Sequence, residues 1–202
     1  MVRDDPFTDI AGHWSADYVT RLYQIGLTEG YQQADGSYIF RPDGKLTRGE
    51  LLAFIARLLE VDTSQYENVA LPFADAGSIA SWLQPYVKSM YALGVFEGSA
   101  KGDKLYANVN DNVTREAAMT MLGRVLAASA SCDLSGFADG GQVSSWASPY
   151  VQTLVSMGIV EGSGGKLTPK SDITRAAAAK LLVEVYGLDK AELTPRADLF
   201  RG

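Results

Sequence analysis

Histidine and cysteine are almost absent from this chain of 202 residues, which contains one of each, His13 and Cys132. A single cysteine excludes a disulfide framework within the chain, and one histidine with one cysteine provides no Cys/His cluster for zinc. Cys132 lies in a Ser/Ala-rich segment without a second histidine to activate its thiol, so a nucleophilic role is disfavoured. His13 is expected to cap or pack at a helix start. We therefore predict that the chain is not an enzyme and uses neither a metal nor a cofactor.

Basic residues and long apolar runs are also scarce. The 18 Lys and Arg residues are outnumbered by 24 Asp and Glu, which gives a net charge of −6. An acidic surface argues against nucleic-acid binding, which requires a basic one. No apolar run reaches the ~20 residues of a membrane span, and residues 1–6 contain no hydrophobic region of a signal peptide. The sequence thus predicts no membrane insertion, and either a cytosolic protein or a mature or excised fragment of a secreted one.

Internal repetition is what the chain has in abundance, and it decides the fold prediction. Each copy opens with Phe-x-Asp, continues with a Trp and then a Tyr-Val pair four residues later, and reaches a Gly that precedes an aliphatic residue and Glu-Gly. The Phe-x-Asp elements are Phe7-Thr8-Asp9, Phe73-Ala74-Asp75 and Phe137-Ala138-Asp139, and the tryptophans are Trp14, Trp82 and Trp146. We predict repeats at 7–60, 73–127 and 137–188 within one globular unit, followed by a tail at 189–202 that is weakly structured or docked in extended form.

Each repeat has the pattern of a helix–loop–helix unit. Apolar residues with a 3.6-residue period predict a helix in each half. The first helix should end at a glycine in the left-handed conformation, namely at Gly26, Gly94 and Gly158. The loop of the first repeat reads as a short hairpin with its turn at Asp35-Gly36, and the other two read as exposed loops. One helix pair cannot bury its apolar face alone. The predicted fold is therefore all-α, with three tandem repeats packed as a pseudo-threefold trimer in one chain.

A Thr-Arg pair begins the second helix of every repeat, and these pairs are the main candidates for a binding site. They are Thr47-Arg48, Thr114-Arg115 and Thr174-Arg175. The threonine is a good N-cap, and in the first repeat Glu50 completes a capping box. The arginine places a cation at the positive end of the helix dipole, which is unfavourable for the helix alone.

Such a cation, repeated three times, indicates an anionic ligand or a fixed ion pair. In the first alternative, a carboxylate lies at the helix N-terminus on unpaired N–H groups and receives charge-assisted bonds from the arginine. Arg→Ala variants would then weaken binding with little change in melting temperature. In the second alternative, the arginines form salt bridges with Asp43, Asp111 or Asp172.

The sequence leaves open the roles of the three tryptophans and of Glu50. Trp14, Trp82 and Trp146 either pack into the core near the helix start or stack on a ligand. Glu50 either contacts the ligand or only caps its helix.

The combined pattern resembles the S-layer homology (SLH) repeat, and the match covers nearly the whole chain. The first repeat is nearest, with His13-Trp14 for the family's His-Trp and Leu46-Thr47-Arg48-Gly49-Glu50 for its Ile-Thr-Arg-Ala-Glu. Ala117 and Ala177 replace that glutamate in the other repeats, where Glu116 is shifted by one position. The resemblance implies a compact, three-pronged helical trimer of repeats at the bacterial cell surface. It also implies non-covalent binding of an acidic, often pyruvylated, secondary cell-wall polymer in grooves between repeats, with unequal grooves in this chain.

Other functions are compatible with the same residues. The ligand could instead be peptidoglycan, the module could assemble with copies of itself or with another surface protein, or the chain could be an enzyme that acts on the wall. As an isolated fragment, the chain is expected to be monomeric.

Overall fold

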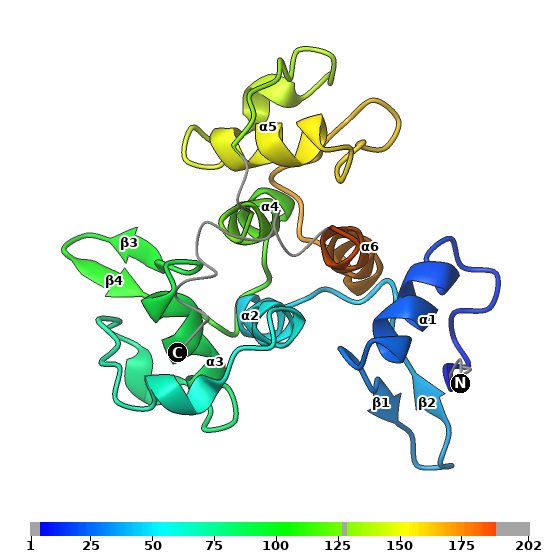
Figure 1. Cartoon of the computed structure of the whole chain (residues 1–202), viewed down its shortest axis with the longest axis horizontal. Coiled ribbons are helices and arrows are strands. Elements are labelled where there is room, and N and C mark those ends of the chain that lie inside the picture. The colour runs from blue at the N-terminus through cyan, green and yellow to red at the C-terminus, as the bar shows by residue number, and fades with distance from the viewer. Residues whose placement is uncertain (1–4, 127–128, 189–202) are drawn as a thin grey trace.

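The computed structural model of the chain describes residues 5–126 and 129–188. Three prongs surround a central group of three helices (Figure 1). The central helices are α2 (Arg48–Leu58), α4 (Arg115–Gly123) and α6 (Arg175–Tyr186), and each prong carries one of α1 (Ala16–Gln24), α3 (Gln84–Ala92) and α5 (Ser148–Ser156). The predicted all-α, three-pronged arrangement of tandem repeats is confirmed. The predicted tail at 189–202 lies outside the described residues.

Helix boundaries follow the local signals in the sequence. The outer helices are followed by Gly26, Gly94 and Gly158, whose φ angles are +77°, +67° and +73°, as expected for glycine at a helix C-terminus. The central helices start immediately after Thr47, Thr114 and Thr174, and each hydroxyl accepts a hydrogen bond from the third helical N–H. The capping box of Thr47 and Glu50 is present. The predictions of these caps are confirmed.

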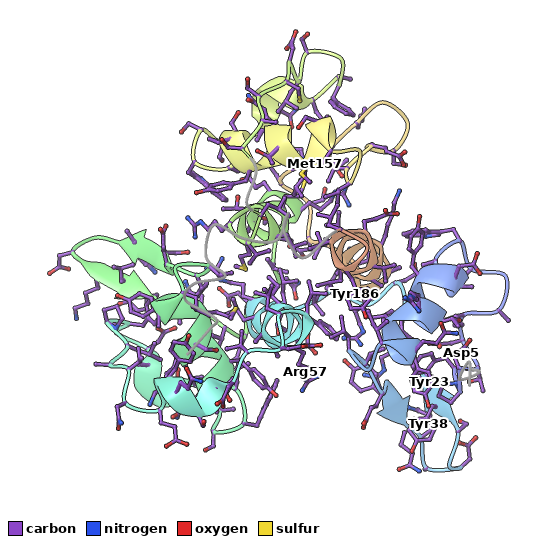
Figure 2. All side chains as sticks on the ribbon, in the orientation of Figure 1. Asp5, Tyr23, Tyr38, Arg57, Met157 and Tyr186 are labelled. Carbon is purple, nitrogen blue, oxygen red and sulfur yellow. The ribbon has the colours of Figure 1, made fainter. Side chains whose placement is uncertain are left out.

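Packing between helices joins different repeats. The outer helix α3 packs against α2, α5 packs against α4, and α1 packs against α6. Each outer helix therefore covers the central helix of the preceding repeat, and the first repeat is completed by the third. The side chains in Figure 2 fill the space between the central helices, and residues of all three repeats join in one hydrophobic core. A single repeat would expose its apolar faces, so the closed ring is the folding unit.

Three backbone hydrogen bonds close this ring on the pseudo-threefold axis. Leu46 N donates to Ile173 O at 3.2 Å, Ile173 N donates to Val113 O at 2.9 Å, and Val113 N donates to Leu46 O at 2.9 Å. All three residues are fully buried. Because the last bond returns to the first residue, the ring fixes the register of the three repeats against one another.

The Phe-x-Asp element stabilises each prong. The Asp139 carboxylate accepts the N–H groups of Leu167 and Thr168, both at 2.8 Å, and the bond from Leu167 lowers the pKa of this carboxyl group. Asp9 and Asp75 accept two backbone N–H groups in the same way. The phenylalanine explains the Glu-Gly signature, since a Cβ on Gly30 would lie 2.2 Å from a ring atom of Phe7.

Two small hairpins and three short 3-10 helices complete the part of the chain that the structure describes. Strands β1 (Tyr31–Gln32) and β2 (Tyr38–Ile39) form the predicted hairpin, and β3 (Ser99–Lys101) pairs with β4 (Lys104–Tyr106) where the sequence predicted only an exposed loop. The turn of this second hairpin contains Gly102, whose φ angle is +64°. Its strands lack an apolar alternation, which is why the pattern was missed. The 3-10 helices are η1 (Thr63–Tyr66), η2 (Ala76–Ser78) and η3 (Gly140–Gln142).

Candidate functional site in the grooves between repeats

The N-termini of the central helices meet the loop of the following repeat. Arg48 N donates to Asp111 O and Gly49 N donates to Val109 O, both at 2.9 Å. The first two N–H groups of α4 and α6 bond to neighbouring loops in the same way, at Ser171, Pro169, Gly44 and Pro42. The third N–H of each helix bonds to its threonine. The prediction that a ligand carboxylate uses these N–H groups is therefore wrong, because the neighbouring repeat already occupies them.

The side chains of the three arginines also reach into the following repeat. Each Nε donates to a loop carbonyl, with distances of 3.2, 2.8 and 2.9 Å for the pairs Arg48–Ala107, Arg115–Leu167 and Arg175–Phe40. Burial lowers the pKa of all three guanidinium groups, yet arginine keeps its charge at neutral pH. The loop carbonyls thus compensate for the unfavourable helix dipole at each cation.

The predicted salt bridges of these arginines are not found. Within the described residues, no ion pair joins them to Asp43, Asp111 or Asp172. Asp43 instead faces His13 at 3.4 Å, and Asp172 accepts a bond from Asn112 at 2.9 Å. The aspartates lie in the loops whose backbone, not side chains, contacts the helix starts.

Groove A opens between the prongs of the first and second repeats. It is a cavity of about 450 Å³ lined by residues 26–31, by α2, by Trp82 and by Arg175. Figure 2 shows Arg57 on the outer side of α2, where it reaches this groove. The groove therefore draws side chains from all three repeats, since Arg175 comes from the third.

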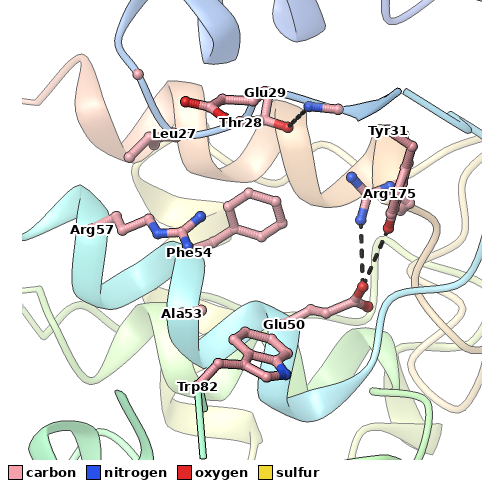
Figure 3. Close-up of a pocket in the computed structure, with 12 residues that line it drawn as sticks. Leu27, Thr28, Glu29, Tyr31, Glu50, Ala53, Phe54, Arg57, Trp82 and Arg175 are labelled. Atoms are coloured by element: carbon pink, nitrogen blue, oxygen red, sulfur yellow. Dashed lines mark hydrogen bonds and ion pairs between the residues drawn. The ribbon is translucent and has the colours of Figure 1, made fainter. Parts of the chain in front are cut away.

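Glu50 is the centre of the polar network in groove A (Figure 3). Its Oε2 accepts the N–H of Thr47 at 2.9 Å, while its Oε1 accepts the hydroxyl of Tyr31 at 3.3 Å and lies 3.8 Å from Arg175 Nη1. Burial raises the pKa of Tyr31, against the opposing effect of Arg175. The side chain of Glu50 therefore caps its helix and also faces the groove, so both roles considered from the sequence are compatible with its position.

Groove B is the equivalent cavity between the third and first repeats, with a volume of about 350 Å³. It is lined by residues 159–163, by three residues of α6, by Trp14 and by Arg115. Lys180, on α6, pairs with Glu161 at 3.0 Å. The loop, central helix, tryptophan and arginine occupy the same relative positions as in groove A.

The third equivalent place, interface C, is bridged by Arg124, the residue that follows α4. Its guanidinium donates to Val95 O at 3.2 Å, pairs with Glu97 at 2.6 Å and lies over the ring of Tyr150 at 5.5 Å. It thereby joins the loop of the second repeat to the outer helix of the third. The guanidinium of Arg57, its counterpart in groove A, donates to the hydroxyl of the equivalent tyrosine, Tyr86, at 3.4 Å, and within the described residues it has no ion pair. This difference leaves groove A open where interface C is crossed.

Glu116 holds the second and third repeats together. Only 4% of the residue is exposed, and its carboxylate pairs with Lys170 at 2.6 Å and accepts the N–H of Ser144 at 2.9 Å. The shift of this glutamate by one position thus takes it out of the groove and into a contact between repeats.

The three tryptophans lie at the surface of the molecule. Trp14, Trp82 and Trp146 are 59%, 58% and 52% exposed, so the alternative that they pack into the core is wrong. Trp82 lines groove A and Trp14 lines groove B. Sequence reasoning missed Tyr31, Arg57 and Lys180 as groove residues. Tyr31 directly follows the Glu-Gly signature, and Arg57 and Lys180 lie in helices that begin at a Thr-Arg pair.

The fold and grooves define a class of protein: a single-chain trimer of repeats with ligand-sized clefts between prongs and aromatic rings at their edges. The S-layer homology domain family matches the chain at residues 6–52, 72–119 and 136–179. The chain therefore belongs to the S-layer homology domain family, a family of binding modules of bacterial cell-surface proteins. Among the described residues, no helix combines the length and apolar character needed to cross a membrane.

Similar proteins include both S-layer proteins and enzymes. The chain is 24% identical to S-layer protein sap of Bacillus anthracis over 93% of its residues, and 28% identical to the surface-layer 125 kDa protein of Lysinibacillus sphaericus over 95%. It is 29% identical to an amylopullulanase of Thermoanaerobacterium thermosulfurigenes over 92%. The matched regions span 22%, 15% and 10% of these relatives, so the chain covers a small part of each.

Proposed function

We propose that this chain is a non-covalent cell-wall anchoring module that binds an acidic, pyruvylated secondary cell-wall polysaccharide in grooves A and B. The observation that supports this most strongly is the pairing, in both grooves, of a largely exposed tryptophan with an arginine that is buried in groove A and half-buried in groove B. In this proposal the repeats are the units 7–60, 73–127 and 137–188.

The chemistry of the two groups suits an acidic sugar. An exposed indole ring offers an apolar face on which a sugar ring can stack, at little cost in side-chain ordering. A guanidinium group offers planar, charge-assisted hydrogen bonds to a carboxylate. The Nε of each arginine is fixed by a loop carbonyl, which orients the rest of the group and reduces the entropy lost on binding.

The relatives favour attachment over catalysis. The same module, in nearly its full length, occurs in proteins named for S-layers and in proteins named for polysaccharide-degrading enzymes. Proteins with such different names share this part while most of their length lies outside it. A common means of attachment to the cell surface accounts for this distribution.

Co-sedimentation with purified wall sacculi tests the proposed function. We expect the chain to sediment with intact sacculi and to remain in solution after acid extraction of the secondary polymers. A Lys101→Ala variant, changed on the exposed β3–β4 hairpin, serves as a matched surface control and should behave like the unchanged chain. Equal binding to both preparations would contradict the acidic-polymer proposal and would favour peptidoglycan as the ligand.

A further inference from the structure

One helical position distinguishes grooves A and B. The third residue after the capping threonine is Glu50 in α2 but Ala177 in α6, and both residues line their grooves. In groove A the Glu50 carboxylate lies 3.8 Å from Arg175. In groove B the equivalent arginine is Arg115, and within the described residues no ion pair joins it to a carboxylate.

A second position increases the difference in charge. Six residues after the threonine, α2 has Ala53 and α6 has Lys180. The charged residues that line groove A are two arginines and two glutamates, whereas groove B is lined by two cations and one glutamate. That single glutamate, Glu161, pairs with Lys180 at 3.0 Å. No carboxylate of the groove lining therefore pairs with the guanidinium of Arg115, on which Asp139 acts favourably from outside the lining.

The two grooves should therefore select different chemical groups. A carboxylate that enters groove A meets an arginine already neutralised by Glu50, and the two carboxylates repel each other at close range. The same pair, with Tyr31 beside it, offers donors and an acceptor to the hydroxyl groups of a neutral sugar. Groove B offers a guanidinium that has no ion pair within the described residues and lies in a partly desolvated site, where attraction for an anion is strong.

We propose that groove B binds the carboxylate-bearing sugar of the wall polymer and that groove A binds a neutral sugar of the same chain. This inference rests on the proposed function and adds to it an assignment of ligand chemistry to each groove. It also places the acidic sugar beside Arg115 of the second repeat, although the first repeat has the most complete family motif.

The three tryptophans allow each place to be observed separately. Trp82 lines groove A and Trp14 lines groove B, and from the equivalent position of Trp146 in its repeat we expect it to report on interface C. The three indole N–H signals in an NMR spectrum can be assigned with Trp→Phe variants. The probe is a hexose glycoside with a pyruvate ketal, and its methyl ester is the uncharged control. We expect the acid to shift the Trp14 signal at lower concentration than the Trp82 signal, and the ester to lose this preference.

Two reciprocal substitutions test the cause. Ala177→Glu places a carboxylate beside Arg115 and should weaken the Trp14 response to the acid about tenfold or more. Glu50→Gln removes the carboxylate beside Arg175 and should strengthen the Trp82 response. Both variants are expected to fold, because Glu and Gln at this position each suit a threonine N-cap. Ala117→Glu, at interface C, is the matched control and should leave the Trp14 and Trp82 responses unchanged.

The outcomes separate this inference from the function on which it rests. If the acid shifts Trp82 first, or if Ala177→Glu leaves the Trp14 response unchanged, the assignment of the grooves is wrong while wall binding in the sedimentation assay still stands. If neither acid nor ester shifts any indole signal, the proposed binding in the grooves is contradicted as well.

Discussion

Replacing Arg175 with alanine is expected to lower the free energy of unfolding by about 2–4 kcal/mol. Only 6% of this residue is exposed. Its Nε bonds to Phe40 O at 2.9 Å, its Nη1 faces Glu50, and its guanidinium lies 4.8 Å from the ring centres of both Tyr31 and Phe40. The alanine variant loses these contacts and leaves a buried carbonyl unpaired at the junction of the third and first repeats.

Urea denaturation of the three single variants Arg48→Ala, Arg115→Ala and Arg175→Ala measures this effect. Each loses the equivalent bond to a loop carbonyl, but Arg48 and Arg115 are half-buried, so their losses should be smaller. This order departs from the prediction made from the sequence, in which all three variants change melting temperature little. Equal and small losses at all three positions would show that the arginines contribute little to the contacts between repeats.

Replacing Trp14 and Trp82 together with alanine should weaken binding to the wall polymer by about 100-fold. Each ring lines one open groove, and a stacked indole that contributes about 1.4 kcal/mol accounts for a tenfold loss at each site. The losses should multiply, because the two rings contact different grooves and share no partner. Calorimetric titration with the purified polymer measures the change.

The matched control for this double variant is Trp146→Ala. Trp146 is 52% exposed, close to the values of the other two, and it has in the third repeat the position that Trp14 and Trp82 have in the first and second. We expect its loss to leave affinity nearly unchanged, and all three substitutions to alter stability by less than about 0.5 kcal/mol, as is usual for exposed side chains. A similar loss of affinity from Trp146→Ala would show that interface C binds the polymer too.

The parts of the fold that depend on neighbours in the sequence could be predicted. Thr47 caps a helix whose first turn follows it, and Gly26 ends a helix whose last turn precedes it. Both roles follow from bonds within a few residues. The turn at Asp35-Gly36 is of the same kind, and repetition of these signals three times gave the number of units and their order.

The parts that depend on the closed ring could not be predicted. Nothing near Leu46 indicates that its N–H bonds to Ile173, which is more than a hundred residues away in the sequence. The first N–H groups of the central helices likewise donate to carbonyl groups of loops that are distant in the sequence. The sequence showed an apparently free anion site at Arg48, and the structure shows a contact between repeats.

For the candidate binding site, the sequence predicted residue types better than their arrangement in space. The Thr-Arg pairs and tryptophans were identified, but their combination crosses repeats: groove A unites Trp82 of the second repeat with Arg175 of the third. The loss of glutamate at Ala177 was visible in the sequence. This loss affects Arg115, which comes from another repeat but lines the same groove as Ala177. Only the three-dimensional arrangement shows that these two residues lie in one groove.

The central claim is that the module recognises the polymer through the polymer's acidic groups. The most direct test is a calorimetric titration of the unchanged chain with the purified secondary polymer, before and after chemical reduction of its carboxylates to alcohols. The account predicts saturable binding to the native polymer and an affinity lower by about tenfold or more for the reduced one, as expected when a charge-assisted contact is lost. Equal affinity for both polymers would contradict it.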